Sequence, residues 1–228
     1  KIITQTDDFV VISKSSDVNF HDEGEHGLGL FSQVKKHLLE QFNITELYPV
    51  HRLDKMTSGL LIFAKNSESA KIFGDLFQAH EIEKYYLALS NKKPTKKQGL
   101  IKGDMEKSRR GMFKLMRTME NPAITQFLSY SIGNKQRLYL LKPHSGKTHQ
   151  LRVALSSIGA PIIGDPLYNT TSSSDRGYLH AYALRFDFLG KAYEFTLPPN
   201  EGEFFLTATI KAKLLELKKP WQNNWPRL

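Results

Sequence analysis

The stretch HRLDKMTSGLL, from His51 to Leu61, organises this chain. Its apolar continuation, Gly59 to Ala64, predicts a buried strand, because a short apolar run between turn residues and polar residues is typical of one. Asp54 then lies on a loop that enters a core strand, and loops held by a rigid scaffold often carry function. Two interpretations stay open here: a functional carboxylate, or a surface Asp54 that caps a turn with Arg52 as its solvated partner.

Hydrophobic patterning outside this stretch predicts further strands and helices. Apolar residues at helical spacing indicate helices over 30–42, after Asn66 or Ser67, over 148–158 and over 203–218. Many strands with few helices between them favour an α+β fold with a mixed, mostly antiparallel sheet, and no linker separates residues 1–228 into two domains. The tail with Trp221 and Trp225 is expected to pack on the body. Strands are expected at 2–3, 9–12, 59–64, 83–89, 124–130, 137–141, 184–188 and 193–197.

Composition points towards a polyanionic partner. The chain has 228 residues, with 32 Lys and Arg against 23 Asp and Glu, and a formal net charge of +9. Such an excess of cations makes nucleic acid the simplest partner. Cysteine is absent, which excludes disulfides, thiolate zinc sites and cysteine nucleophiles. No apolar run reaches the length of a membrane span, and the first residues lack a signal-peptide pattern, so a cytoplasmic location is expected.

Residues 91–117 are strongly basic and interrupted by glycines. The segment is too long for a plain connection, which favours a binding loop or hairpin. A solvated charged face is the alternative, but few acidic residues balance the cations here.

Several common chemistries do not fit the spacing of residues. There is no Gly-x-Gly-x-x-Gly after a strand, no Walker loop and no Gly-x-Ser-x-Gly elbow, which argues against nucleotide binding and serine hydrolysis. A zinc site made from His51, His144, His149 and His180 is allowed by composition, but isolated histidines usually have other roles. His149 and Arg152 are three residues apart in a predicted helix and would share a face.

One constellation remains: the carboxylate of Asp54, the cation of Arg152 and the aromatic ring of Tyr86. On a basic protein these groups could process a nucleobase. The ring stacks on the base, the cation keeps the carboxylate ionised, and the carboxylate attacks. Sequence spacing does not place the three side chains together in space.

Four motifs in order, the last of them in two parts, give the chain a family resemblance. Residues 51–61 closely resemble the signature of the RluA-type pseudouridine synthases. Residues 83–88 (EKYYLA) resemble the family's Lys-x-Tyr strand, and 145–153 (SGKTHQLRV) resemble its Thr-Gly-Arg-Thr-His-Gln-Leu-Arg-Val motif. Residues 161–168 (PIIGDPLY) and 179–181 (LHA) resemble later segments of the family. The resemblance implies the α+β pseudouridine synthase fold, with an active-site cleft beside the central sheet.

The resemblance also implies roles for single residues. Asp54 would be the catalytic aspartate, Tyr86 would stack on the uracil and help to remove the C5 proton, and Arg152 would pair with the aspartate. Arg52 would fill the stack when the uridine flips out of the RNA. The matching motifs and the basic loop further imply substrate contacts from His51, Lys84, His149, Leu151, Arg109 and Arg110.

The family's properties imply tRNA or rRNA as the partner, with a loop uridine as target because flipping costs least there. No metal or organic cofactor is implied, nothing requires more than a monomer, and a single catalytic domain without an S4-type RNA-binding module is expected. Residues 13–17 (SKSSD) depart from the commoner Asn-Lys-Pro-x-Gly, so that loop is expected to differ in shape. Ser145, Lys147 and Ala154 also depart from the commoner Thr, Arg and His.

The interpretation is therefore an RNA pseudouridine synthase that needs no cofactor. One rival is an RNA-binding protein of the same fold that has lost catalysis. Another is a hydrolase of glycosidic bonds in which Asp54 works with a second acid.

Overall fold

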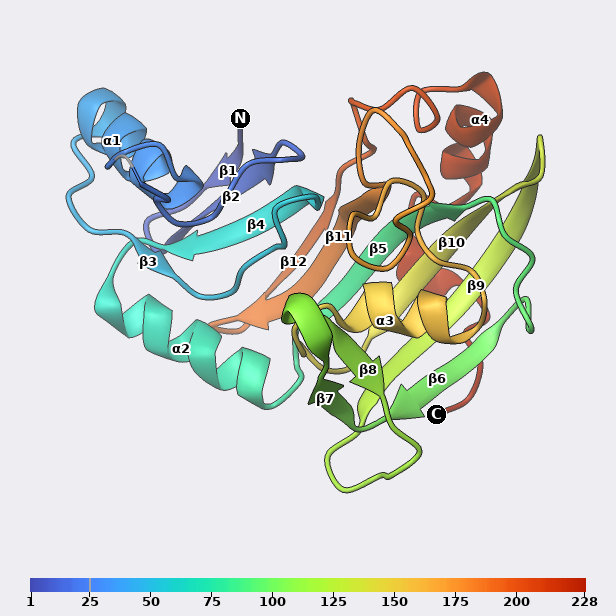
Figure 1. Cartoon of the computed structure of the whole chain (residues 1–228). Helices are drawn as coiled ribbons and strands as arrows, with labels where there is room; N and C mark the ends of the chain where they lie inside the picture. Colours follow the sequence, from blue (N-terminus) through green and yellow to red (C-terminus); the bar gives the residue numbers. More distant parts are fainter. Residues whose placement is uncertain (25) are drawn as a thin grey trace.

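A mixed sheet of ten strands runs through the molecule, in the order β1-β2-β4-β11-β5-β10-β9-β6, with β3 beside β4 and β12 beside β11 (Figure 1). The computed structural model describes residues 1–24 and 26–228. The pair β4 and β11 is parallel and the other pairs are antiparallel, so the expected α+β class is confirmed. The strands are β1 (Ile2–Gln5), β2 (Phe9–Lys14), β3 (Tyr48–Pro49), β4 (Ser58–Ala64), β5 (Glu83–Ser90), β6 (Gly99–Gly103), β9 (Ala123–Gly133), β10 (Gln136–Pro143), β11 (Leu179–Phe188) and β12 (Lys191–Thr196).

Helices flank this sheet, and a small hairpin stands apart from it. The hairpin pairs β7 (Met105–Lys107) with β8 (Phe113–Leu115), and a short 3-10 helix, η1 (Arg109–Gly111), forms its tip. No helix in residues 1–24 and 26–228 is both long enough and apolar enough to cross a membrane. The helices are α1 (Leu30–Phe42), α2 (Ser67–Gln78), α3 (Gln150–Ser157) and α4 (Ala208–Glu216), followed by a second 3-10 turn, η2 (Pro220–Gln222).

Strand β4 is buried along its whole length because helices cover both of its faces. Ile62 packs in one apolar cluster with Phe73 of α2, whereas Phe63 packs in another with Leu38 of α1. Successive side chains of a strand point to opposite faces, so α1 and α2 lie on opposite sides of the sheet. Burial on both faces explains why β4 is a continuous apolar run rather than an alternating one.

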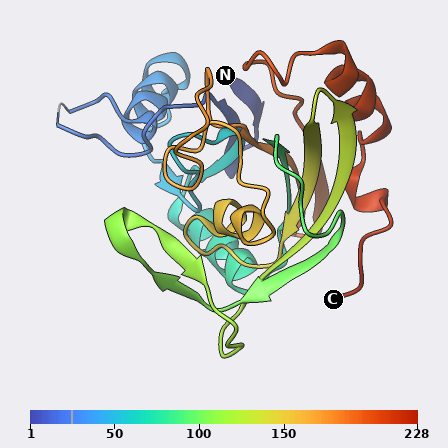
Figure 2. The ribbon, with the colours of Figure 1, turned by 45° about the vertical axis from the view of Figure 1, so that its right-hand side comes forward.

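The other half of the sheet is covered by α3 on one face and by α4 with the C-terminal tail on the other (Figures 1 and 2). On β5, the ring of Tyr85 lies against Trp221 and Trp225 of the tail, with centroid distances of 6.2 and 5.7 Å. The tail therefore packs on the body as expected. Tyr86, the next residue, points to the opposite face, towards α3.

The start of β4 meets β11 at a very close backbone approach. Gly59 has a φ of +114°, and a Cβ atom at this position would lie 2.2 Å from the carbonyl oxygen of Ala181. Only glycine fits this conformation and this spacing. The close approach fixes the loop that precedes β4 against the centre of the sheet.

Local signals predicted some element boundaries well and others badly. Helix α2 begins at Ser67, where the side chain of Asn66 accepts a 2.8 Å hydrogen bond from the Ser69 amide. The predicted helix over 203–218 was too long, since α4 spans only Ala208–Glu216. The helical spacing placed Leu206 on the inward face of that helix and Phe42 on the apolar face of the helix over 30–42, but both side chains are exposed, Leu206 at 39% and Phe42 at 51%.

Phe73 tests how strongly α2 is held to the sheet. Its ring is buried and stacks on Phe188 with a centroid distance of 4.8 Å. We expect Phe73→Ala to lower the free energy of unfolding by about 3–5 kcal/mol, because it leaves a cavity in a packed core. Phe42→Ala, an exposed control on α1, should change it by no more than about 0.5 kcal/mol. Urea unfolding of both variants measures the difference.

Candidate active site

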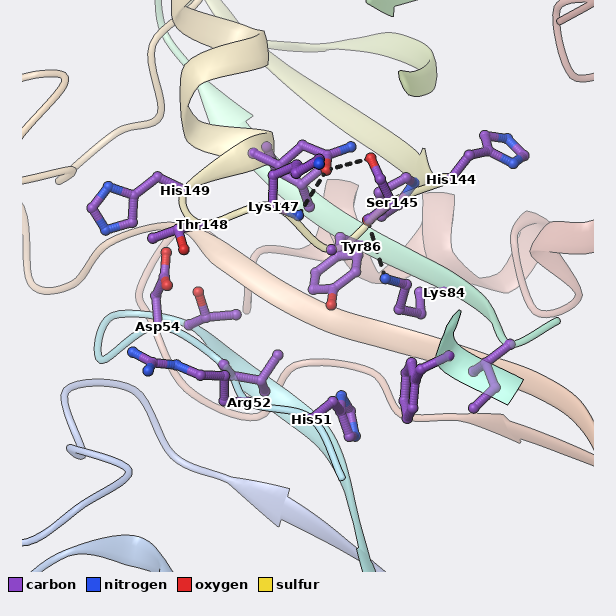
Figure 3. Close-up of a pocket in the computed structure, with 18 of the residues that line it drawn as sticks. His51, Arg52, Asp54, Lys84, Tyr86, His144, Ser145, Lys147, Thr148 and His149 are labelled. Carbon is purple, nitrogen blue, oxygen red and sulfur yellow. Dashed lines mark hydrogen bonds between the residues drawn. The ribbon is translucent and has the colours of Figure 1, made fainter. Parts of the chain in front are cut away.

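A cavity of about 450 Å³ opens between the loop before β4, strand β5 and the start of α3. Figure 3 shows side chains from these segments turned towards one another. Arg109 and Arg110 lie outside the lining, on the tip of the β7–β8 hairpin. Eight of the ten residues predicted from the sequence line the cavity: Asp54, Tyr86, Arg152, Arg52, His51, Lys84, His149 and Leu151.

A buried guanidinium joins two carboxylates in the cavity wall. Arg152 Nη1 lies 3.1 Å from Asp54 Oδ2. On its other edge, Arg152 Nε and Nη2 each donate a 2.8 Å hydrogen bond to Asp165. The side chain of Asp54 is 23% exposed, whereas those of Arg152 and Asp165 are 5% and 0% exposed. Asp54 is thus the carboxylate that a ligand in the cavity can reach.

Asp165 is held ionised by its surroundings. Burial alone would raise the pKa of this carboxyl, but the hydrogen bonds and charge of Arg152 hold it below its usual range. The backbone amides of Leu167 and Tyr168 add hydrogen bonds of 2.9 and 3.1 Å to Asp165 Oδ1. Burial would likewise lower the pKa of Arg152, but Asp165 and Asp54 together raise it. The cation that faces Asp54 therefore stays charged.

Strand β5 places two further side chains in the cavity. Lys84 and Tyr86 are two residues apart, so they share one face of the strand. Burial raises the pKa of Tyr86 above its usual range, and the negative charge of Asp54 raises it further. Burial lowers the pKa of Lys84 to about 8, and its Nζ donates a 3.2 Å hydrogen bond to the Ser145 carbonyl oxygen.

The loop before β4 contributes His51 and Arg52 in different ways. His51 Nε2 accepts a 2.9 Å hydrogen bond from the Ile62 amide, and its ring stacks on Phe77 at 4.8 Å. Burial lowers the pKa of His51 to about 3, so the ring is neutral. Arg52 is exposed and makes no ion pair with Asp54, whose ion-pair partner among the described residues is Arg152.

His149 does not belong to the helix in which the sequence placed it. It precedes α3 and has a φ of 57°, so it shares no helical face with Arg152. The two side chains still meet at Tyr168. His149 Nδ1 lies 2.9 Å from the Tyr168 hydroxyl, and the Arg152 guanidinium lies 5.2 Å from the centre of the Tyr168 ring.

The sequence assigned no role to Asp165 or Tyr168, although both lie in the quoted stretch 161–168. The available signal was a single Asp within a turn-rich apolar stretch. A carboxylate in such a place must be paired, and a buried Arg152 is a suitable partner.

The four histidines of the suggested zinc site do not converge. Among the described residues, no group of three or more His, Cys, Asp or Glu side chains is placed to hold a metal ion. Each histidine has a different partner: His51 the Ile62 amide, His144 the side chain of Gln126, His149 the Tyr168 hydroxyl and His180 the side chain of Ser58.

Comparison with known proteins assigns the chain to a family. A family model described as RNA pseudouridylate synthase matches residues 8–157. A protein named as an uncharacterized RNA pseudouridine synthase from Haemophilus influenzae is 49% identical over 223 residues, which cover 97% of each chain. The chain belongs to the RNA pseudouridine synthase family.

Other relatives and solved structures agree with this assignment. Ribosomal large subunit pseudouridine synthase C of Rickettsia bellii is 36% identical over 171 residues, which are 73% of this chain and 56% of that protein. The chain thus spans little more than half the length of this relative. The structure of human RNA pseudouridylate synthase domain containing 1 matches with a TM-score of 0.73 and 25% identity, over 96% of this chain and 94% of that one.

The loop that carries Asp54 in this synthase is anchored by Lys14, just after Asp54. Lys14 Nζ donates hydrogen bonds to the carbonyl oxygens of Ser15, Lys55 and Thr57, at 3.0, 2.9 and 2.7 Å. The Thr57 amide donates to the Asp54 carbonyl oxygen at 2.9 Å, which closes the turn. The unusual sequence of residues 13–17 therefore still places a lysine where it holds the loop.

Ser58, directly after this loop, sits in a buried polar network. Its hydroxyl lies 2.8 Å from Arg176 Nη2 and 2.7 Å from His180 Nδ1. His180 Nε2 lies 2.7 Å from the Leu197 carbonyl oxygen, so the proton of the neutral ring belongs on Nε2 and Nδ1 accepts from Ser58. Burial lowers the pKa of His180 from 6.5 to about 4.

This network predicts a loss of stability in acid. As the pH falls from 6.5 towards about 4, the unfolded chain binds a proton at His180 that the folded chain does not. The free energy of unfolding should then decrease by up to about 1.4 kcal/mol per pH unit from this group. We expect His180→Gln to be less stable than wild type at neutral pH. Its free energy of unfolding should decrease less steeply than that of wild type as the pH falls. His37→Gln, exposed on α1, should keep the wild-type slope. Urea unfolding at several pH values gives the slope of the free energy of unfolding against pH for each protein. Equal slopes for wild type and His180→Gln would contradict the lowered pKa of His180.

Proposed function

We propose that this chain converts uridine in tRNA or rRNA to pseudouridine, with Asp54 as the nucleophile. The observation that carries the proposal is the contact of 3.1 Å between Arg152 and Asp54, in a cavity that also holds Tyr86. This arrangement places a partly exposed carboxylate, paired with a buried cation, beside an aromatic ring that a base can stack on.

The reaction exchanges the bond from C1′ to N1 for a bond from C1′ to C5, and one proton is lost from C5 while one is gained at N1. Asp54 attacks the bound uridine, either at C1′ of the ribose or at C6 of the uracil. The bond between N1 and C1′ breaks, the base rotates, and a bond forms between C5 and C1′. C5 then loses its proton and N1 gains one, so substrate and product are isomers. Release of Asp54 restores the enzyme without a cofactor.

The charge of Asp54 changes during this cycle, and Tyr86 responds to it. The negative charge of Asp54 is one of the two causes that raise the pKa of Tyr86. A covalent bond to substrate removes that charge, so the Tyr86 hydroxyl loses a proton more easily in the covalent stage. If Asp54 bonds to C6 of the uracil, it stays bonded until C5 has lost its proton, and on that route Tyr86 is suited to assist the step. If Asp54 bonds to C1′, the bond from C5 displaces it before that proton is lost.

Asp165 is poorly suited to the role of the second acid that a glycosidic hydrolase needs. It is fully buried, and Arg152, Leu167 and Tyr168 all donate hydrogen bonds to it. A proton donor must reach the leaving atom, and this carboxyl faces away from the cavity.

Cations at the cavity and on the hairpin support an RNA substrate. Arg52 lies exposed at the cavity, and Arg109 and Arg110 extend from the hairpin tip. A uridine must leave its stack to enter a cavity of about 450 Å³, which costs least in a loop. Rickettsia bellii synthase C is named for the large ribosomal subunit, which supports rRNA as one of the two candidate substrates.

Asp54→Asn tests the nucleophile directly. An amide of the same shape keeps the cavity but has lost the nucleophilic charge, so we expect pseudouridine formation to fall by at least about 10³-fold. Tritium release from RNA labelled at C5 of uridine measures the reaction. Asp187→Asn, an exposed control on β11, should keep full activity.

The same experiment separates the rival functions. Free uracil among the products would indicate hydrolysis, because the isomerase leaves none. Binding of RNA without tritium release from wild-type protein would indicate a catalytically silent protein. Full activity of Asp54→Asn would remove Asp54 from the mechanism.

Arg152→Lys tests the geometry of the cation. Lysine keeps the charge but cannot donate from three guanidinium nitrogens to Asp54 and Asp165 together. We expect kcat to fall by about 10- to 100-fold, as the loss of one or two charge-assisted hydrogen bonds implies, while KM changes little. Lys36→Arg on α1, where the side chain is exposed, is the matched control and should leave both constants unchanged.

A further inference from the structure

The Tyr168 hydroxyl joins the active site to a part of the chain far from it in sequence. It accepts a 2.8 Å hydrogen bond from the Phe113 amide, at the start of β8. It also lies 2.9 Å from His149 Nδ1. Since a hydroxyl has one proton, the bond from Phe113 directs that proton to His149. Burial and the charge of Arg152 lower the pKa of His149, which favours the neutral ring with an accepting nitrogen.

The same tyrosine contacts Arg152 and Asp165, the buried pair behind Asp54. Its ring lies 5.2 Å from the Arg152 guanidinium. Its backbone amide donates a 3.1 Å hydrogen bond to Asp165 Oδ1, the carboxylate that holds Arg152. A shift of Tyr168 therefore moves a surface against which Arg152 is packed.

The hairpin that Tyr168 holds is a separate two-stranded sheet, outside the main sheet. Figure 1 shows it beside α3, and the ring of Phe113 meets the edge of His149 at 5.6 Å. Four of its side chains are exposed cations, one of which, Lys114, pairs with Glu106 at 3.7 Å, whereas Phe113 is half-buried. The hairpin thus has a charged tip that can bind a polyanion. Its other side, at Phe113, contacts the active site. The exposed cations are Lys107, Arg109, Arg110 and Lys114.

We propose that Tyr168 is a positioning residue that couples contact of RNA with the β7–β8 hairpin to the alignment of Arg152 with Asp54. This inference rests on the proposed function. RNA held at the tip fixes the hairpin, the fixed hairpin holds the Tyr168 hydroxyl through the Phe113 amide, and the Tyr168 ring holds Arg152. Binding at the hairpin then raises the rate of the chemical step as well as the affinity.

A double-mutant cycle tests this coupling. Arg109→Ala with Arg110→Ala removes two charges from the hairpin tip, and Tyr168→Phe removes only the hydroxyl while it keeps the ring against Arg152. We expect the hairpin variant to raise KM and to lower kcat, each by about 10-fold, and Tyr168→Phe to lower kcat by about 10-fold with little change in KM. The combined variant should have the kcat of Tyr168→Phe alone, because the coupling is already lost, and the KM of the hairpin variant.

Tyr178→Phe is a matched control. The Tyr178 hydroxyl also accepts a hydrogen bond from a backbone amide, that of Phe204 at 3.0 Å, and donates to a side chain, Asp175. It lies outside the lining of the cavity. We expect kcat to stay within about twofold of wild type, and its combination with the hairpin variant to give the kcat of the hairpin variant alone.

Each outcome decides for or against the coupling. A hairpin variant that raises KM and leaves kcat unchanged would overturn it, as would kcat losses that multiply to about 100-fold in the combined variant. If thermal unfolding shows that Tyr168→Phe does not fold, the hairpin variant in the wild-type background decides by its kcat. Failure of the proposed function is distinguishable, since the wild-type protein would then form no pseudouridine at all.

Discussion

The buried guanidinium of Arg152 is the constraint on which the active site depends. A buried charge is costly unless it is paired, and Arg152 is only 5% exposed. Asp165 takes two of its nitrogens, which leaves Nη1 for Asp54. The loop before β4, helix α3 and the turn at 161–168 must therefore meet at one point. The close approach of Gly59 to Ala181 and the lysine anchor at residue 14 hold the loop there.

Local elements were predictable where one pattern decides them. Strand β4 is a continuous apolar run because helices cover both of its faces, and α2 begins at Ser67 because the side chain of Asn66 caps it. The prediction of helix boundaries failed where tertiary packing, rather than the local sequence, determines them. Leu206 has the spacing of a buried helical residue, but α4 begins two residues later, so Leu206 is exposed. His149 lies just before α3 with a positive φ, which no spacing in the sequence reveals.

The candidate site was predictable in part, and the motifs rather than the spacing made it so. Asp54 and Arg152 are 98 residues apart, and only the family resemblance suggested that they meet. Asp165 and Tyr168 received no role, although the motif that contains them was quoted. Their importance comes from hydrogen bonds to Arg152 and to the Phe113 amide, which are contacts between distant segments. A sequence pattern records the residue types but not these partners.

The chemistry proposed for Asp54 explains why Arg152 pairs with two carboxylates, Asp54 and Asp165. When Asp54 bonds to the substrate it becomes neutral. With Asp54 as its only partner, Arg152 would then hold an unpaired buried charge, at a cost of several kcal/mol. Asp165 is fully buried and paired with Arg152, and in the proposed cycle it would keep that pairing while Asp54 reacts. Asp54 can therefore react with the substrate because Asp165 does not. In the covalent stage Arg152 would still have Asp165 as its partner.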